Sequence, residues 1–313
     1  SLGGPGKPGF PAITLFKVLL LQQWYGLSDP QTEEALADRL SFRSFIGLSL
    51  DEKVPDHSTI HRFRDRIAPI IDQLFAEVNR QLDGKNLILR KGTLVDATLI
   101  QAAGRPPSKA TETPSDPDAR WGGKGDDPTY GYKAHIGLDQ DSELIRQAEL
   151  TPANVHDSQQ LQAMASGDEQ AVYADKGYFG LKYSIWLRNH GIRDGIMIKA
   201  TRGHPLTPLQ KEINRRITQV RRSIEHVFGT MKRNFNHGYF LTRGIDKVGG
   251  EMGLTVLAYN IRRVLNILGV DGLIAAVKLK SNKIFNDLEN KWQKLKSFFS
   301  WRLKTTYIEV ICT

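Results

Sequence analysis

The chain has 313 residues, 40% hydrophobic and 25% charged, which is a composition typical of a folded globular protein and excludes a disordered chain. No stretch approaches the roughly 20 consecutive apolar residues of a membrane-spanning helix, and the single cysteine, Cys312, excludes an internal disulfide. Lys and Arg total 43 against 34 Asp and Glu. The resulting net charge of +9 favours a polyanionic partner, nucleic acid first, and we expect a cytoplasmic protein with no membrane partner.

Helix signals dominate the first part of the chain. Ser28–Pro30 offers a capping residue and a proline for the first turn, and apolar residues then recur at helical spacing. Asp56 gives a second start signal, ahead of a short basic helix over residues 60–66. We therefore predict that residues 1–85 form an all-α N-terminal domain.

The second of these helices carries three arginines at alternate positions, Arg62, Arg64 and Arg66. Two short helices separated by a turn, with a basic second helix, fit a helix-turn-helix that presents its basic face to DNA. A helical bundle with a solvated charged face fits the same pattern equally well. This segment alone does not decide between the two.

From residue 86 the pattern changes to short extended segments alternating with helices. The predicted strands cover residues 87–89, 93–95, 130–138, 143–150, 171–174 and 192–198. The predicted helices cover residues 157–164, with Asp157 as cap, 181–189 and 208–232. Residues 101–127 are rich in polar residues, Gly and Pro, which favours a mobile loop. We predict a mixed α/β domain over residues 86–268, followed by a basic tail over 269–313.

Three acidic residues stand out by their positions. Asp96 lies inside an apolar extended run, where a buried carboxylate costs several kcal/mol unless a cation compensates it. Asp175 follows a strand and precedes a glycine turn, at the sheet edge where α/β proteins keep their sites. Glu225 lies on the long basic helix. Taken singly, each acid is more often a cap, a turn former or a solvated side chain than a catalytic group.

The helix around Glu225 is not charge-balanced. At 100° per residue, Arg221, Glu225 and Lys232 fall within about 40° of one another on one face. Ordinary ion pairing along a helix is the simplest interpretation of this spacing and contributes only a few tenths of a kcal/mol. The excess of arginine and lysine here favours a helix that meets an anion.

Three segments together resemble the DDE triad and signature helix of bacterial insertion-sequence transposases, in particular the insertion-sequence-five family of the insertion-sequence-four/five group. These segments are Val95–Thr98, Ala174–Tyr178 and the helix with the spacing Arg221-x3-Glu225-x6-Lys232. Residues 20–28, 40–45 and 154–158 resemble further parts of that family. One position departs from the broader signature, because Thr218 stands where that signature has Tyr.

The resemblance implies an RNase H-like mixed sheet flanked by helices, preceded by the all-α domain. It implies that Asp96, Asp175 and Glu225 are catalytic and hold two Mg²⁺ ions, with Mn²⁺ as a substitute, since carboxylate oxygens suit these cations. The implied activity is metal-dependent cleavage of DNA at the ends of an insertion sequence, followed by strand transfer to a target. The implied partner is DNA, bound by a homo-oligomer in the nucleoid.

Six side chains are expected to contact DNA. Arg221 and Lys232 are expected to hold phosphates near the metals. The remaining candidates are Arg222, Arg62, Arg64 and Tyr178. For Tyr178, stacking on a displaced base and simple packing are both open, and packing is the commoner role of such an aromatic residue.

Two other functions stay open beside the active transposase. One is a DNA-binding protein without catalysis, as in a decayed or domesticated copy. The other is a metal-dependent nuclease of the same core that cuts without joining. The tail also allows two interpretations, because its interleaved basic and aromatic residues suit non-specific DNA binding but also an extension outside the family pattern.

Overall fold

The computed structural model describes residues 9–107, 114–123 and 128–269. Residues 1–261 belong to one compact unit and residues 262–313 to a second. The predicted basic tail lies outside the described residues, apart from its first residue. Within the described ranges, no helix is both long enough and apolar enough to cross a membrane. The division into domains at residues 85 and 268 stays a prediction.

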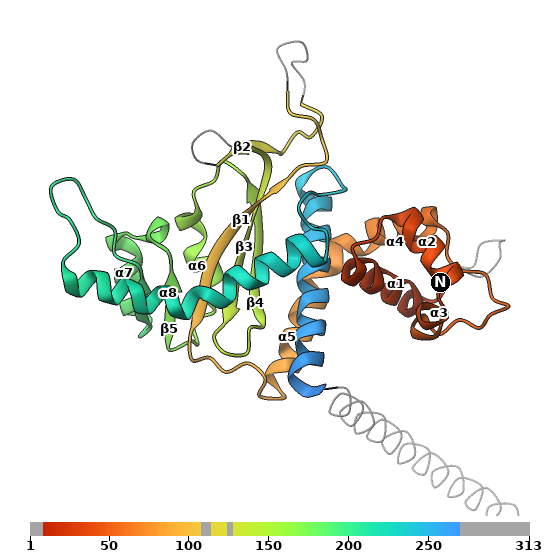
Figure 1. The fold of residues 1–313 in the computed structure, drawn as a ribbon, viewed down its shortest axis with the longest axis horizontal. Coiled ribbons are helices and arrows are strands. Elements are labelled where there is room, and N and C mark those ends of the chain that lie inside the picture. The colour runs from red at the N-terminus through yellow and green to blue at the C-terminus, as the bar shows by residue number, and fades with distance from the viewer. Residues whose placement is uncertain (1–8, 108–113, 124–127, 270–313) are drawn as a thin grey trace, which may run out of the picture. The chain divides into compact units, whose positions relative to one another are not determined.

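The N-terminal part of the compact unit is entirely helical (Figure 1). Its helices are α1 (Ala12–Tyr25), α2 (Asp29–Asp38), α3 (Leu40–Ile46), α4 (His57–Ile67) and α5 (Ile71–Asp83). The Ser28 side chain accepts a hydrogen bond from the Gln31 amide in a capping box, and Asp56 accepts one from the Thr59 amide. Both predicted helix starts are therefore confirmed.

The N-terminal helices do not enclose a core of their own. Leu19, Leu36 and Ile60 are at most 1% exposed, and the core that they form also contains Leu254 and Leu257 from the helix over residues 245–269. The Trp24 indole of α1 donates a 2.9 Å hydrogen bond to a carbonyl oxygen of that helix. A segment from the far end of the described chain is thus part of the N-terminal core.

A six-stranded mixed sheet follows in the sequence (Figure 1). Its strands are β1 (Thr93–Gln101), β2 (Arg120–Gly122), β3 (Thr129–Asp139), β4 (Ile145–Pro152), β5 (Ala171–Ala174) and β6 (Arg193–Ile196). The spatial order is β2-β3-β1-β5-β6, and β4 pairs with β3 as well. The pairs β1–β3, β2–β3 and β3–β4 are antiparallel, whereas β1–β5 and β5–β6 are parallel. The predicted mixed α/β architecture is confirmed.

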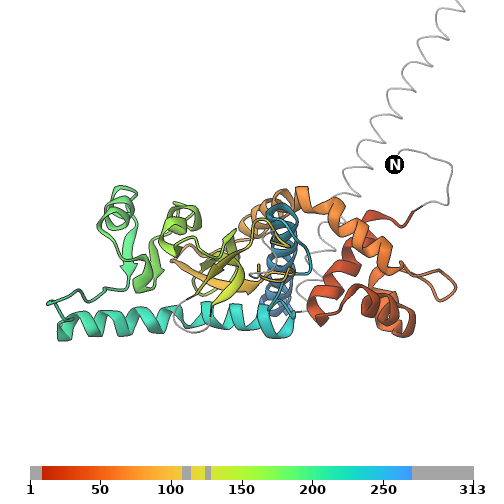
Figure 2. The same cartoon turned by 90° about the horizontal axis from the view of Figure 1, so that it is seen from above.

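Helices cover both faces of the sheet, as Figure 2 shows. A 3-10 turn (Asp157–Gln160), α6 (Leu161–Met164) and α7 (Leu181–Asn189) pack on the face that carries Val95 and Val172. On the opposite face lies α8 (Pro208–Gly229), which packs against Leu94 and Ile136. The start of α8 is fixed by a capping box with Pro208 in its first turn.

Four details of the predicted elements are wrong. Residues 87–89 form no strand, because the Asp139 carboxylate accepts the amides of Leu89 and Arg90 in place of a neighbouring strand. The segment 101–127 contains β2 and the fully buried Asp116, which accepts a 2.8 Å hydrogen bond from the Tyr132 hydroxyl. The remaining two errors are the cap at residue 156, which is His and not Asp157, and the end of α8, which continues as a π-helix over Thr230–Asn234.

The contact between α1 and the helix 245–269 contains a buried histidine. His237 is 3% exposed, and its Nδ1 lies 3.2 Å from the Thr255 hydroxyl, which itself donates to Gln23 of α1. Burial lowers the pKa of His237 to about 4. Because unfolded histidine binds a proton near pH 6.5, the unfolded state takes up a proton at higher pH than the folded state. The contribution of this residue to stability is therefore lost as the pH falls from about 6.5 to 4.

We predict that acidification from pH 7 to 4.5 lowers the free energy of unfolding, with His237 contributing up to about 3 kcal/mol. The measurement is urea denaturation at a series of pH values. His237→Gln should flatten this pH dependence, whereas His204→Gln, at an exposed position, should leave it as in the unsubstituted protein. Equal slopes for all three proteins would contradict the assignment to His237.

Candidate active site

The register of the parallel strands brings two of the predicted acids together. Val95 of β1 pairs with Ala174 of β5, so the next residues along both strands are Asp96 and Asp175. Neighbouring strands lie about 4.8 Å apart, and side chains two residues apart on a strand point to one face. Both carboxylates therefore leave the sheet on the face that α8 covers.

Each of these carboxylates has one oxygen fixed by the backbone. Asp96 Oδ1 accepts a 2.9 Å hydrogen bond from the Ala97 amide, and Asp175 Oδ1 accepts one of 2.7 Å from the Gly177 amide. The second oxygens differ. Asp96 Oδ2 lies 2.8 Å from Arg221 Nη2, whereas no described residue donates to Asp175 Oδ2.

The environment of Asp96 disfavours its charge. The pKa of Asp96 is raised to about 6, chiefly by burial. The Arg221 guanidinium and the Ala97 amide lower it, and the negative charges of Asp175 and Asp157 raise it. A positive charge beside Asp96 therefore favours its ionised form near neutral pH.

Arg221 supplies that charge from α8. The helix is attached to the end of the sheet by Asn214, whose side chain exchanges hydrogen bonds of 2.8 and 2.9 Å with the backbone of Ile198. Arg221 follows two turns later and is 7% exposed. In the structure its partner is Asp96, and the expected contact of Arg221 with a DNA phosphate stays a prediction.

Glu225 does not join the two aspartates in the structure. It lies four residues after Arg221 and so on the same side of α8, one turn further along. Its side chain is exposed and makes no hydrogen bond or ion pair with any described residue. Across the described ranges, no three His, Cys, Asp or Glu side chains are close enough together to hold a metal ion. The structure assembles Asp96, Asp175 and Arg221, and leaves Glu225 one turn away.

The other cations predicted on this helix take different positions. Lys232 is half-buried, and burial lowers its pKa. It lies in the π-helical segment Thr230–Asn234, whose wider turn invalidates the 100° rule that placed it on the Arg221 face. Arg222 is exposed and lines an open groove with Arg216 and the turn between β3 and β4. Of the predicted cations of α8, Arg222 remains free to meet a phosphate.

A fourth acid, Asp157, lies near the site, and sequence reasoning missed it by treating it as a helix cap. Lys133 Nζ of β3 lies 2.7 Å from Asp157 Oδ1. The 3-10 turn that carries Asp157 packs against the turn Lys176–Tyr178, which directly follows Asp175. The available signal was the segment 154–158, which already resembled the transposase pattern.

Tyr178 is a packing residue. Its ring is 0% exposed, so it has no surface on which a DNA base could stack, and the stacking role is wrong. Its hydroxyl has no hydrogen-bond partner among the described residues. Burial, and then the charges of Asp96, Asp157 and Asp175, raise its pKa well above the ordinary value.

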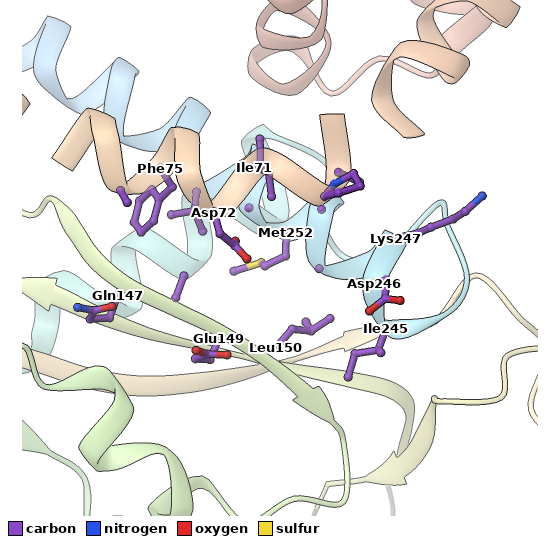
Figure 3. A pocket seen from close by; sticks show the side chains of 18 of the residues that line it. Ile71, Asp72, Phe75, Gln147, Glu149, Leu150, Ile245, Asp246, Lys247 and Met252 are labelled. Atoms are coloured by element: carbon purple, nitrogen blue, oxygen red, sulfur yellow. The ribbon is translucent and has the colours of Figure 1, made fainter. Parts of the chain in front are cut away.

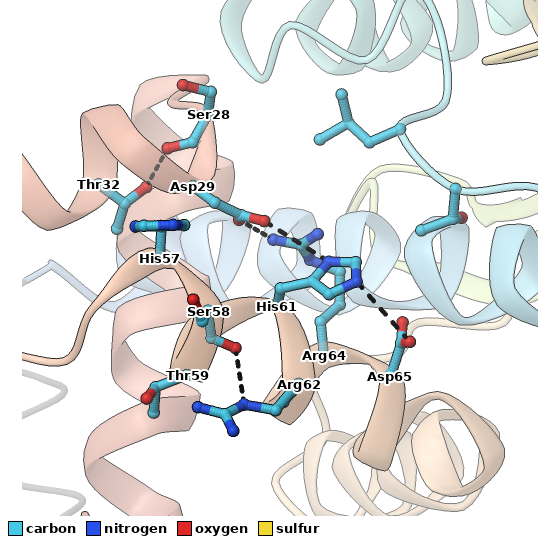
Figure 4. Close-up of polar contacts among 12 residues, drawn as sticks. Ser28, Asp29, Thr32, His57, Ser58, Thr59, His61, Arg62, Arg64 and Asp65 are labelled. Atoms are coloured by element: carbon cyan, nitrogen blue, oxygen red, sulfur yellow. Dashed lines mark hydrogen bonds and ion pairs between the residues drawn. The ribbon is translucent and has the colours of Figure 1, made fainter.

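Arg64, which was expected to contact DNA, is buried, and its side chain points toward Asp29 (Figure 4). It is 5% exposed, pairs with the Asp29 carboxylate and donates a 3.0 Å hydrogen bond to Gln22 Oε1. Arg62 is exposed, and its Nε donates to the Ser58 carbonyl at 3.2 Å. Arg64 therefore joins α4 to α1 and α2, and the basic face of α4 is narrower than the sequence predicted.

A separate cavity of about 910 Å³ lies between α5, β4 and the first half of the helix 245–269 (Figure 3). Its walls include Phe75, Leu150 and Met252, with Asp72 and Glu149 as acidic groups. The charge of Asp72 adds to burial in raising the pKa of Glu149. None of the predicted catalytic or DNA-binding residues lines this cavity.

Comparison with known proteins identifies the family. The family model described as "Transposase DDE domain" matches residues 89–261, and one described as "Transposase domain (DUF772)" matches residues 2–66. The chain therefore belongs to the family of transposases with a DDE domain. Among solved structures, "Crystal structure of the Mos1 Strand Transfer Complex" is similar at 13% identity and a TM-score of 0.22, over 84% of this chain and 79% of that chain. A TM-score of this size does not establish a common fold.

We predict that Arg64→Ala destabilises the protein by about 3 kcal/mol, because it removes the guanidinium paired with the half-buried Asp29 carboxylate and the donor to the buried Gln22 Oε1. Arg62→Ala, two residues away and exposed, should change the free energy of unfolding by less than about 0.5 kcal/mol. Urea denaturation of both variants measures this difference. An equal loss in the two variants would mean that the Arg64 pair contributes little.

We predict that Tyr178→Phe leaves the free energy of unfolding unchanged or raises it by about 1 kcal/mol, since it removes a buried hydroxyl that has no partner. Tyr178→Ala should cost about 3 to 5 kcal/mol, because it leaves a cavity in the core beside β5. Thermal and urea denaturation of the metal-free variants are the measurements. Destabilisation by the Phe variant would show that the hydroxyl has a partner in solution.

Proposed function

We propose that the chain is an active DDE transposase of the insertion-sequence-five type, which cleaves the ends of its element and joins them to target DNA. The observation that carries this proposal is the adjacency of Asp96 and Asp175 on the parallel strands β1 and β5, beneath a basic helix. Family membership supplies the reaction class, and this adjacency supplies a place for it. The mixed sheet with helices on both faces supports an RNase H-like core.

The residues present fit a divalent cation. Asp175 Oδ2 receives no hydrogen bond from the described residues. The pKa of Asp96 is raised, and an added positive charge lowers it. Carboxylate oxygens are the ligands that Mg²⁺ prefers, with Mn²⁺ as a substitute. We assign Asp96, Asp175 and Glu225 to hold two ions. When bound, such ions activate an attacking oxygen and stabilise a leaving oxygen in an in-line displacement at phosphorus.

The residues of the chain then position the DNA. Arg222 of α8 and Arg62 of α4 are exposed, and we assign them to backbone phosphates. We also assign the half-buried Lys232, in the π-helical segment after α8, to a phosphate. In the first step, water attacks a phosphodiester at the element's end and the 3′ oxygen leaves as a 3′-OH. In the second step, that 3′-OH attacks a target phosphodiester and displaces another 3′-OH. No covalent bond between protein and DNA forms in either step.

One observation favours a second candidate, a DNA-binding protein without catalysis. Glu225 makes no contact with Asp96 or Asp175 in the structure, so the triad is not closed. We favour the active enzyme because Glu225 is exposed on the side of α8 that Arg221 shares, one turn from the carboxylates. We further propose that a homo-oligomer pairs two element ends on the nucleoid in the cytoplasm.

We predict that Asp96→Asn, Asp175→Asn and Glu225→Gln each reduce cleavage and joining to background. The measurement incubates purified protein with labelled element ends, target plasmid and Mg²⁺, and resolves cut from joined products. Glu212→Gln, on the same helix but only partly exposed and paired with Arg215 and Arg216, is the matched control and should retain both activities.

The products also separate the candidate functions. Joining supports a transposase, cutting without joining indicates a nuclease, and binding without cutting indicates a protein that has lost catalysis. Full activity in any one of the three acid variants would remove that residue from the metal site.

A further inference from the structure

Both carboxylate oxygens of Asp96 already have a hydrogen-bond partner in the structure. Its Oδ1 accepts the Ala97 amide at 2.9 Å, and its Oδ2 faces Arg221 Nη2 at 2.8 Å. On the neighbouring strand, Asp175 is engaged at Oδ1 only. A divalent cation that approaches the two carboxylates therefore finds one oxygen open on Asp175 and a guanidinium already placed on Asp96.

The Arg221 guanidinium has more N–H donors than it has hydrogen-bond partners in the structure. Arginine has five N–H donors, yet the contacts of Arg221 are one carboxylate oxygen and a distant thioether, with Nη1 at 3.9 Å from Met197 Sδ. Its Nε has no partner among the described residues, and the side chain is only 9% exposed. A buried arginine that makes one strong contact retains the capacity for a bidentate anion such as a phosphate.

The positive charge near Asp96 and a divalent cation perform the same electrostatic task. Both neutralise the Asp96 carboxylate, and a cation that binds Oδ2 competes with the guanidinium for that oxygen. Once a cation takes over this task, the pair with Arg221 is no longer required. Arg221 then carries an unneutralised charge beside the place where a cleaved phosphodiester must lie.

We propose that Arg221 exchanges partners, neutralising Asp96 in the cation-free protein and moving to a DNA phosphate when a divalent cation binds Asp96. This inference rests on the proposed function, since it assumes that the cation and the DNA backbone meet at Asp96. Its consequence is coupling: cation binding strengthens DNA binding through Arg221, and DNA strengthens cation binding by the same factor.

The neighbouring residue supplies a matched control. Arg222 is also on α8 but is exposed and has no contact with Asp96 or Asp175. Its contribution to DNA affinity therefore does not depend on whether a cation is bound to these carboxylates. Substitution at Arg222 should therefore weaken DNA binding by the same factor with and without the cation, while substitution at Arg221 should remove the cation's effect.

The test measures the affinity of the full chain for a fluorescent DNA duplex by anisotropy, in EDTA and in Ca²⁺ at constant ionic strength. Ca²⁺ is chosen because it binds carboxylate oxygens. In the unsubstituted protein, Ca²⁺ should raise the affinity by a factor of roughly 5 to 150, the usual range of coupling between two sites. Arg221→Gln should show no such rise, and Arg222→Gln should show the full factor.

Asp96→Asn provides the decisive variant. It removes the carboxylate charge and so releases Arg221 without any cation. We expect this variant in EDTA to bind DNA as tightly as the unsubstituted protein in Ca²⁺, with no further rise on adding Ca²⁺. The double variant Asp96→Asn with Arg221→Gln should lose the gain, which shows that the gain acts through Arg221.

Two results would overturn the exchange: Asp96→Asn that binds DNA in EDTA no more tightly than the unsubstituted protein, or a rise in Ca²⁺ that Arg221→Gln retains. Asp96→Asn keeps the size of the side chain and leaves Arg221 in place. Its result therefore tests the exchange even if the Arg221 variant does not fold. The strand-joining assay is a separate readout. Joining without coupling would reject the exchange alone, and coupling without joining would reject the proposed catalysis alone.

Discussion

A carboxylate that is largely shielded from water needs a countercharge, and in this protein the strand residue Asp96, whose side chain is 24% exposed, obtains it from a helix. The ion pair between Asp96 and Arg221 joins β1 to α8 across 125 residues of sequence. Together with the Asn214 contacts to Ile198, it holds α8 on the sheet and accounts for the burial of Arg221. Glu225 lies one turn further along α8 and is exposed.

The parallel pairing of β1 with β5 is the second constraint. It sets Asp96 beside Asp175 without any direct bond between them, because adjacent positions on parallel strands are adjacent in space. The turn after Asp175 then packs against the turn that carries Asp157. Negative charge thus accumulates at one edge of the sheet, while the basic side chains of α8 lie above it.

Much of the fold was predictable from local signals. The Ser28 and Asp56 caps, the two hairpin strands and the strand before Asp175 follow from capping chemistry and alternation of apolar residues, which act over a few residues. The short strand β2 was not predictable in this way. It lies in a polar segment that is held by a single buried acid, Asp116, and such a contact between distant residues leaves no periodic pattern.

The sequence indicated which acids belong to the candidate site better than it indicated where the surrounding side chains lie. The two aspartates follow from their strand positions, but burial of Arg64, Arg221 and Tyr178 depends on partners far away in the sequence. The position of Lys232 depends on a local widening of the helix that the 100° rule does not contain. Arginines that a sequence suggests are exposed can thus be buried and form ion pairs between separate elements of the fold.

The shared core of α1 and the helix 245–269 has a consequence for how DNA would be handled. Trp24, Leu254 and Leu257 hold the N-terminal helices against the chain segment that follows the sheet, within one compact unit. If those helices bind a recognition sequence, side-chain packing and not a flexible linker sets the distance from that sequence to the scissile phosphodiester. A change in the spacing between the recognised bases and the scissile bond would then have to be absorbed by bending the duplex.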